Sequence, residues 1–159
     1  MSIAKKVKDY LEQNHVPYTH CRHRPAYTAQ ELAEAQHISG WNVAKTVVFQ
    51  ADDQFVMVVL PAAFRVDLEE LRQELPFDTL KLASEKDLAW LFMDSELGAM
   101  PPFGNLYKLP VYVDQSLAAR EEIVFNAGTH MDTIRMRYAD FEKLVHPQLI
   151  HAAFARTGD

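Results

Sequence analysis

The chain has 159 residues, of which 48% are hydrophobic and 24% are charged, and its formal net charge is −6 at pH 7. This length suits one domain with a substantial core, and no apolar run approaches the roughly 20 residues that span a bilayer. The negative charge excludes a broad basic clamp on nucleic-acid backbone, but it leaves room for contact with a single nucleic-acid end.

Cysteine content and the N-terminal residues indicate the cellular compartment. The single cysteine, Cys21, permits no internal disulfide, so nothing in the sequence calls for an oxidising environment. We interpret Cys21 as a small core residue rather than a nucleophile. The first residues lack the apolar core of a secretory signal, and linkers and repeats are absent. We therefore expect a cytoplasmic protein without a membrane partner, folded as a single domain over residues 1–159.

Helical spacing and turn residues organise the first 40 residues. Apolar side chains at helical spacing predict a first helix that ends before Pro17. Residues 18–22 have the pattern of a short edge strand. A capping box at residues 28–31 predicts a second helix that runs to about His37, and Gly40 suits the exit from that helix.

Two apolar runs at the centre of the sequence predict a β-hairpin. Residues 47–49 and 55–60 are rich in β-branched and aromatic side chains, and the acidic residues between them suit a turn. Lys45 stands at the start of the first strand, where alternation places its side chain on the same face as Val47 and Phe49. Its ammonium group therefore either extends past the end of the sheet into solvent or serves a task that needs a cation.

The second half of the chain mixes helices and strands without strict alternation. Potential N-cap residues at Asp67 and Ser84 predict two helices. Apolar patterning predicts strands at residues 80–83, 109–114, 122–127 and 133–138, and a last helix at residues 139–145. Together these elements predict a mixed α/β (α+β) fold with a mostly antiparallel sheet flanked by helices.

One segment of the second half suits neither a helix nor a regular strand. Residues 95–104 place Pro101 and Pro102 between Gly98 and Gly104, which excludes continuous backbone hydrogen bonding. The backbone N–H and C=O groups of such a loop are free to contact a ligand. The alternative is that the loop only connects two elements.

Common catalytic and metal-binding motifs are absent from the sequence. It contains no glycine-rich phosphate loop, no GxSxG nucleophile elbow and no CxxC or HExxH metal pattern. His15, His20 and His23 surround the predicted edge strand, but their spacing matches no known zinc site, and we interpret them as solvated surface residues. We expect no metal and no cofactor.

Three short motifs follow one another in an order that is more specific than any of them alone. They are Val43-Ala44-Lys45-Thr46-Val47-Val48, the GxxxP sequence Gly98-Ala99-Met100-Pro101-Pro102, and the turn Asn126-Ala127-Gly128. Together they resemble the YbaK/ProX family of aminoacyl-tRNA deacylases, which shares its fold with the editing insertion domain of bacterial prolyl-tRNA synthetase. The resemblance extends from the first helix to about Val145. It implies a compact, partly barrel-like mixed sheet flanked by helices.

The resemblance implies hydrolysis of the ester that joins a wrongly attached amino acid to the 3′ end of tRNA. Lys45 falls on the family's functional lysine, and residues 98–102 fall on its substrate-positioning loop. A lysine cation can bind the terminal adenosine or its phosphate and stabilise charge that develops at the carbonyl, while loop backbone groups position the aminoacyl moiety. The sequence shows no protein base, and we hypothesise that the substrate's own ribose hydroxyl or amine activates water.

Substrate specificity is less well defined by the sequence. Thr46, Met100 and His130 are candidates for lining the substrate pocket, with Gly128 beside them, although His130 also suits an exposed turn. Because a methylene discriminates by only about 1–3 kcal/mol, alanine, cysteine, serine and threonine all stay open. We expect action in trans on the aminoacyl-tRNA 3′ end, alone or docked to an aminoacyl-tRNA synthetase. Two alternatives are a non-catalytic module that binds aminoacyl-adenosine or the tRNA end, and a synthetase-associated adaptor.

Overall fold

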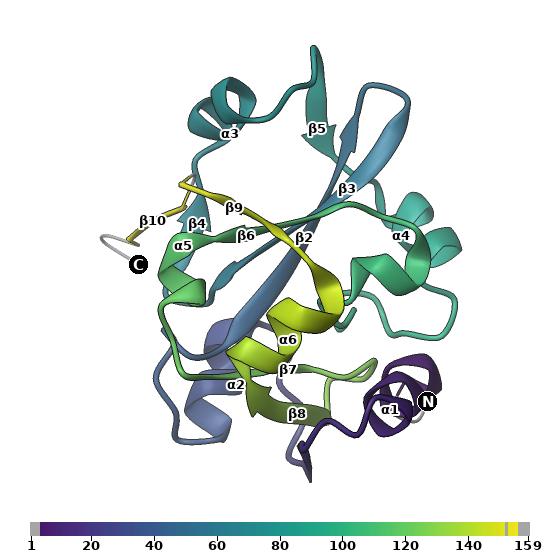
Figure 1. Cartoon of the computed structure of the whole chain (residues 1–159), viewed down its shortest axis with the longest axis vertical. Coiled ribbons are helices and arrows are strands. Elements are labelled where there is room, and N and C mark those ends of the chain that lie inside the picture. The colour runs from purple at the N-terminus through teal and green to yellow at the C-terminus, as the bar shows by residue number, and fades with distance from the viewer. Residues whose placement is uncertain (1–3, 152, 156–159) are drawn as a thin grey trace.

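The central hairpin forms the middle of the fold in the computed structural model, which describes residues 4–151 and 153–155 (Figure 1). Strand β2 (Ala44–Ala51) pairs antiparallel with β3 (Gln54–Pro61) along its whole length. At the turn, Asp52 adopts a positive φ of 52°, and its carboxylate accepts hydrogen bonds from the backbone N–H and the hydroxyl of Thr79. The predicted hairpin and its acidic turn are confirmed.

A five-stranded sheet is built around this hairpin in the order β5-β2-β3-β6-β9. Strand β5 (Leu80–Leu82) pairs antiparallel with β2, whereas β6 (Val111–Asp114) runs parallel to both β3 and β9 (Gln148–Ile150). The edge strands β5 and β9 are only three residues long, and the described strands do not close into a barrel. The mixed, mostly antiparallel α/β fold is nevertheless the one that the sequence predicts.

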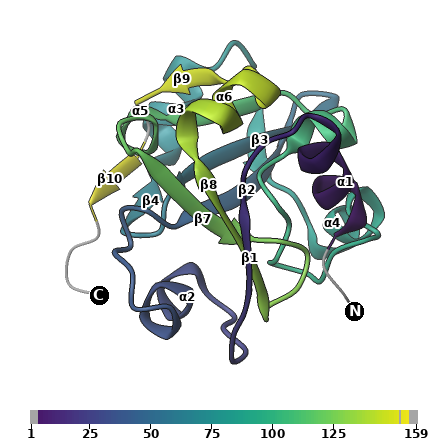
Figure 2. The same cartoon turned by 60° about the horizontal axis from the view of Figure 1, so that its bottom comes forward.

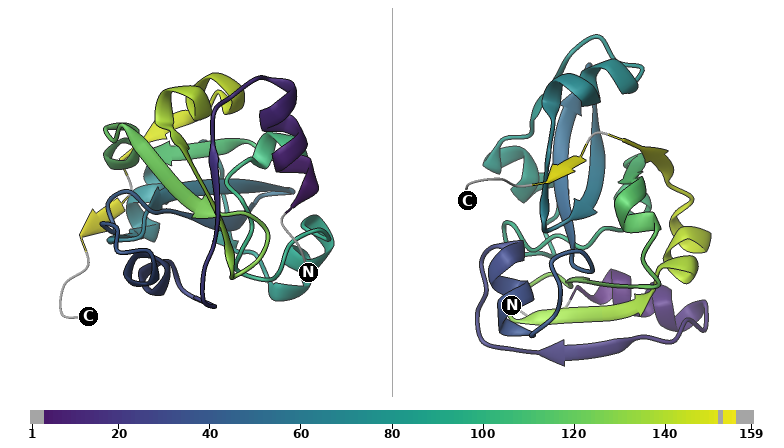
Figure 3. Two further views of the ribbon diagram at one scale, coloured as in Figure 1. Left: turned by 90° about the horizontal axis from the view of Figure 1, so that it is seen from below. Right: turned by 90° about the vertical axis from the view of Figure 1, so that its left-hand side faces the viewer.

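A second, antiparallel sheet crosses one end of the hairpin, as Figures 2 and 3 show. Its order is β1 (Thr19–Arg22), β8 (Asp132–Arg137) and β7 (Glu122–Asn126). A parallel bridge between Val43 and Val124 joins this sheet to the residue that precedes β2. A third, two-stranded sheet pairs β4 (Phe64–Val66) with β10 (Ala153–Ala155).

Helices surround the sheets, and most begin at the capping residues that the sequence offers. The described helices are α1 (Lys5–Gln13), α2 (Ala29–Ala35), α3 (Leu68–Glu74), α4 (Glu85–Leu91), α5 (Gln115–Ala118), α6 (Tyr138–Val145) and a 3-10 turn (Gly104–Tyr107). Ser84 and Asp87 form a reciprocal capping box at α4. At α2, the Thr28 hydroxyl accepts a hydrogen bond from the Glu31 backbone N–H. The Glu31 carboxylate accepts from the Tyr27 backbone N–H rather than from that of Thr28, so this capping box is not reciprocal.

The two faces of the central hairpin pack into different cores. Val48 faces a core shared with α1, α6 and the three-stranded sheet, in which Phe103 makes edge-on ring contacts with Tyr10, Phe125 and Phe141. Phe49 faces the other core, which α3 covers. This alternation places Lys45 on the Phe49 side, as the period of the strand predicts.

Two local predictions are wrong. Cys21 is exposed rather than buried, because β1 is an edge strand and all four of its residues face solvent. The exit from α2 uses His37, whose φ is 55°, whereas Gly40 has no positive φ; Gly40 instead allows close approach to Ala63. Among residues 4–151 and 153–155, no helix has both the length and the apolar character that a membrane crossing requires.

Candidate functional site

Lys45 lies between two hollows at the end of the hairpin that meets the three-stranded sheet. It is the second residue of β2 and is half-buried. On one side it borders a cavity of about 160 Å³, here named the inner cavity. On the other side it borders a hollow of about 230 Å³, here named the outer groove. A cation at the boundary of two hollows can contact both parts of a ligand that extends from one into the other.

The inner cavity is assembled from four segments that lie far apart in the sequence: the start of α2, the start of β2, the GxxxP loop and the end of β7. Its lining consists of Ala29, Ala44, Lys45, Thr46, Gly98, Met100 and Asn126. Four of the predicted site residues, Lys45, Thr46, Gly98 and Met100, are thus brought together around one space. Sequence reasoning missed Ala29 and Asn126 as lining residues, although Asn126 stands in the turn motif that carries the resemblance.

The GxxxP loop is held in place by backbone hydrogen bonds to the turn at Gly128. The Gly128 N–H donates to the Ala99 carbonyl at 2.9 Å, and the Glu96 N–H donates to the Gly128 carbonyl at 2.7 Å. Gly98 has a φ of +84°, which disfavours any side chain. Ala99, Pro101 and Pro102 are buried and do not line the inner cavity. Their contribution is to the shape of the loop rather than to its exposed surface.

Gly128 lies beside the start of α1 rather than at the inner cavity. Its φ is +98°, and a Cβ at this position would lie 2.8 Å from the Ala4 nitrogen. The Ala4 N–H donates to the carbonyl of Ala127 at 2.8 Å. Gly128 therefore lets the start of α1 approach the turn, and it does not line the inner cavity.

His130 is buried, so the alternative that it sits on an exposed turn is wrong. Its Nε2 lies 2.7 Å from the Leu97 carbonyl oxygen, and its Nδ1 lies 3.2 Å from the Ala26 carbonyl oxygen. Its backbone N–H donates to the Glu96 carboxylate at 2.8 Å. The imidazole thus connects the GxxxP loop to the segment before α2. The ring also packs against the loop itself, because its Cε1 lies 3.4 Å from the position that a Cβ on Gly98 would occupy.

The outer groove is apolar except for Lys45. It is lined by Lys45, Val47, Phe49, Val66, Leu68 and Leu82. Leu82, on β5, is 64% exposed, so the groove opens to solvent along this edge. An exposed apolar surface beside a cation suits a ligand with a flat apolar part and a negative charge.

A buried carboxylate lies behind the turn rather than in the cavity. Asp132 is 1% exposed; burial by itself raises its pKa, but hydrogen bonds from Thr129 and His20 and the charge of Arg22 hold this pKa below its usual range. The His20 Nε2 lies 2.8 Å from the Asp132 carboxylate. In the part of the chain that the structure describes, no group of three potential metal ligands comes together.

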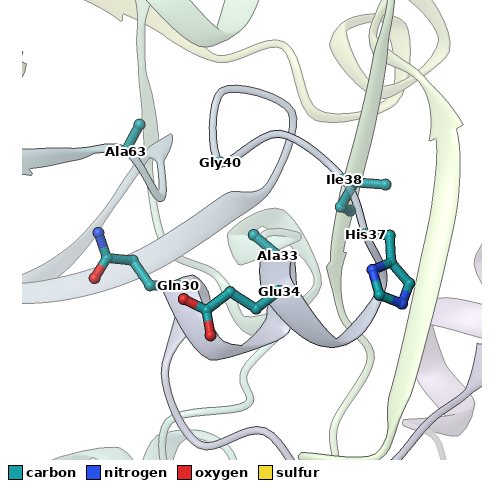
Figure 4. A pocket seen from close by; sticks show the side chains of 7 residues that line it. All are labelled: Gln30, Ala33, Glu34, His37, Ile38, Gly40 and Ala63. Atoms are coloured by element: carbon teal, nitrogen blue, oxygen red, sulfur yellow. The ribbon is translucent and has the colours of Figure 1, made fainter.

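A larger hollow of about 650 Å³ lies on α2 and the segment that follows it, but it is a weaker candidate site (Figure 4). Gln30 and Glu34 project from one face of α2, and His37 stands at the far end of the helix. Neither Lys45 nor any part of the GxxxP loop reaches this hollow. The inner cavity, which Lys45 and part of the GxxxP loop line, is therefore the stronger candidate site.

Residues 23–144 match the model of the family described as "Aminoacyl-tRNA editing domain", and the chain belongs to this family. The family resemblance that the three sequence motifs suggest is thereby confirmed.

Relatives in sequence agree with this assignment, and a solved structure shares the fold. The chain is 32% identical over 106 residues to the multifunctional Ser/Thr-tRNA deacylase ProXp-y of Escherichia coli (strain K12), a match that covers 66% of this chain and 62% of the relative. It is 30% identical over 105 residues to proline–tRNA ligase of Leuconostoc citreum (strain KM20), covering 66% of this chain and 18% of the ligase. The chain thus spans less than two thirds of these relatives. A solved structure described as a candidate trans-editing enzyme for prolyl tRNA synthetase superposes with a TM-score of 0.80 at 23% identity, covering 96% of this chain and 97% of the other.

Proposed function

We propose that this protein is a trans-acting deacylase that hydrolyses the ester of tRNA mischarged with a small amino acid. Membership of the editing-domain family supports this reaction class. The observation that carries the proposal is the position of Lys45 at the boundary between the inner cavity and the outer groove. The substrate of an editing reaction has two parts, an amino acid and a terminal adenosine, and the scissile ester lies between them.

The two hollows suit the two parts of such a substrate. Sites for drug-sized ligands measure about 300–1,000 Å³, and at about 160 Å³ the inner cavity suits a small amino acid side chain. The outer groove offers apolar surface on which the terminal base can pack. In this arrangement the ester carbonyl lies beside the Lys45 ammonium group.

Lys45 then acts on the reacting atoms. Its positive charge stabilises the negative charge that develops on the carbonyl oxygen when water attacks. Among the described residues that line the inner cavity, Lys45 is the one ionisable side chain. We therefore assign water activation to the ribose hydroxyl or the amine of the substrate. Thr46, Gly98 and Met100 contact the aminoacyl group, and Ala99, Pro101, Pro102, Gly128 and His130 hold the loop in position.

The same proposal defines partners and location. The substrate is the 3′ end of an aminoacyl-tRNA, and the relationship to proline–tRNA ligases supports action close to a synthetase. The substrates named for the Escherichia coli relative, Ser-tRNA and Thr-tRNA, fall within the size class that the inner cavity suits. The cytoplasm, where translation takes place, is the location that this activity implies.

The proposal is tested by deacylation assays on tRNAs charged with alanine, cysteine, serine or threonine. The Lys45→Ala variant should lose at least about 100-fold in kcat/KM, the scale on which removal of one stabilising charge affects catalysis. Its unfolding transition should match that of the native protein. Lys143→Ala, which removes an exposed lysine on α6, is the matched control and should keep full activity.

Two outcomes would contradict the proposal. The first is a folded Lys45→Ala variant with native activity. The second is absence of hydrolysis across the whole panel, which would favour the alternative of a module that binds the tRNA end without turnover.

A further inference from the structure

A further hollow adjoins the inner cavity along α4 and the loop that follows this helix. Its volume is about 440 Å³, and it is here named the α4 hollow. Most of its lining is apolar, with Leu88, Phe92, Met93 and Leu97 among the lining residues. None of the residues of α4 is fully buried, so part of the apolar side of this helix is left uncovered. The α4 hollow therefore has the size and the lining of a site for an apolar group.

Met100 is the one described residue that lines both the α4 hollow and the inner cavity. It is 7% exposed and belongs to the same apolar core as Phe92, which lines the α4 hollow. Its sulfur accepts a hydrogen bond from the Gly98 N–H at 3.2 Å, and Gly98 lines the inner cavity. The Met100 side chain thus touches the surroundings of both spaces and stands between them.

The position of Lys45 decides on which side the inner cavity can be extended. Lys45 separates this cavity from the outer groove, which the proposed function assigns to the adenosine. Ala44, Lys45 and Thr46 also belong to β2, which is paired with β3 along its whole length and forms a fixed wall. The side that is left for a longer amino acid side chain is the one that Met100 closes.

Packing explains how one methionine can limit the size of the substrate. Protein interiors are close-packed, so a side chain too large for about 160 Å³ must displace Met100 and break its contact with the Gly98 N–H. An apolar pocket distinguishes side chains that differ by one methylene by about 10–200-fold, and leucine exceeds alanine by more than that. A shorter residue at position 100 would instead leave a gap that joins the two spaces.

We propose that Met100 is the partition that sets the upper size limit of the aminoacyl group, and that the α4 hollow is a closed-off extension of the substrate pocket. This inference rests on the proposed deacylase function and identifies a residue that determines its specificity. When Met100 is shortened, a leucyl side chain passes from the inner cavity into the α4 hollow. There it packs against apolar side chains such as Leu88 and Phe92.

The test uses one tRNA charged with either alanine or leucine, so that contacts to the nucleic acid are the same for both substrates. The native protein should favour the alanyl ester. Met100→Ala should raise the ratio of leucyl to alanyl kcat/KM by at least about tenfold. Met100→Val removes less of the side chain, should raise the ratio by a smaller factor, and answers the question if Met100→Ala does not fold. Met100→Leu conserves the volume and should keep the native ratio, whatever its absolute rate.

Two substitutions in the α4 hollow serve as controls. Met93 is 76% exposed and lines the α4 hollow but not the inner cavity, so Met93→Ala should keep the native ratio. Ala89→Phe places a large side chain in the α4 hollow. Combined with Met100→Ala, it should restore the rejection of the leucyl ester. An equal rise of the ratio in Met93→Ala would overturn the inference, and so would a double variant that keeps the full gain.

A binding measurement separates failure of this inference from failure of the deacylase proposal. Non-hydrolysable amide analogues of alanyl- and leucyl-adenosine are titrated against the same proteins by calorimetry. If no tRNA is hydrolysed but Met100→Ala gains affinity for the leucyl analogue, the inference holds for the pocket and the deacylase proposal fails alone. If the alanyl ester is hydrolysed and the preference stays native in both Met100→Ala and Met100→Val, the inference fails alone. Binding of neither analogue to any of the proteins would overturn both.

Discussion

Two glycines of the loop region should respond differently to the same substitution. Gly98 and Gly128 both have positive φ angles, of 84° and 98°. A left-handed conformation costs a residue with a side chain roughly 1–2 kcal/mol. Because alanine also restricts the unfolded chain, about 0.4–1 kcal/mol of this cost is offset. For Gly98→Ala the net loss in the free energy of unfolding should be about 1 kcal/mol, since its Cβ meets only the edge of the His130 ring at 3.4 Å.

Gly128→Ala adds a steric conflict to the same strain. Its Cβ would lie 2.8 Å from the Ala4 nitrogen and 2.9 Å from the Ala4 Cβ, so the start of α1 must move. Overpacking of this kind costs typically 1–3 kcal/mol, which gives a total loss of about 3 kcal/mol. For a chain of this length each kcal/mol lowers Tm by roughly 2–4 °C. Gly98→Ala should therefore lower Tm by roughly 3 °C and Gly128→Ala by roughly 9 °C.

The loss of deacylation activity should follow the opposite order from the loss of stability. Gly98 lines the inner cavity, and relief of its strain moves the Leu97 carbonyl that lies 2.7 Å from His130. A displacement of about 1 Å in a positioning group can cost about 100-fold in rate. Deacylation measured at 20 °C should thus fall strongly in Gly98→Ala and less in Gly128→Ala, whose Cβ meets the start of α1 rather than the inner cavity. The reasoning would be refuted if the two variants lost equal stability, or if Gly98→Ala kept full activity.

Two further predictions concern the buried carboxylate and the outer groove. Asp132→Asn should cost about 1–3 kcal/mol at pH 7, because it weakens the buried interactions with Thr129 and His20. The lowered pKa of Asp132 means that its contribution is present above the usual value of 3.8 and is lost as pH falls through the folded-state pKa. Urea unfolding at pH 7 and below pH 3.8 should therefore show a difference between native and variant that shrinks in acid, and a constant difference would argue against this role. Leu82→Asp should raise KM for charged tRNA several-fold with little change in Tm, because the 64% exposed Leu82 borders the groove proposed to hold the adenosine. Leu149→Asp, on the opposite edge strand, is its control, and an equal rise in KM for both would exclude a local effect.

Local signals explain which parts of the fold could be predicted from the sequence. The hairpin follows from two adjacent apolar runs, and the start of α4 follows from a capping box, both of which depend on neighbours within a few residues. The parallel pairing of β3 with β6 depends on segments about 50 residues apart in the chain, and no local pattern encodes it. Cys21 shows the same limit, because alternation along a strand does not reveal whether anything covers either face.

The candidate site residues divide in the same way, into those with a local sequence signal and those without one. Lys45 stands out as a cation at the start of an apolar strand, but this pattern also fits a side chain that extends into solvent. The family resemblance makes Lys45 a candidate site residue, and the GxxxP motif marks its own loop. His130 could not be placed, because its burial depends on contacts with Leu97 and Ala26, which come from two other segments. Asn126 could not be placed either, because no local pattern encodes the bridge between Val43 and Val124, which joins β7 to the start of β2.

In the proposed function, the group that acts on the ester and the loop that contacts the amino acid belong to different elements. Lys45 belongs to a strand that is paired along its full length with β3, so its backbone is fixed whatever the cavity holds. Asn126 of β7 and the GxxxP loop line the same cavity from other elements, and His130 and the Gly128 turn hold that loop in place. Under this proposal, a substitution at Asn126 should change which side chain fits without moving the cation, whereas a change at Lys45 should affect every substrate alike. Since catalytic groups act best from rigid elements, the fold allows substrate choice to vary while the chemistry stays the same.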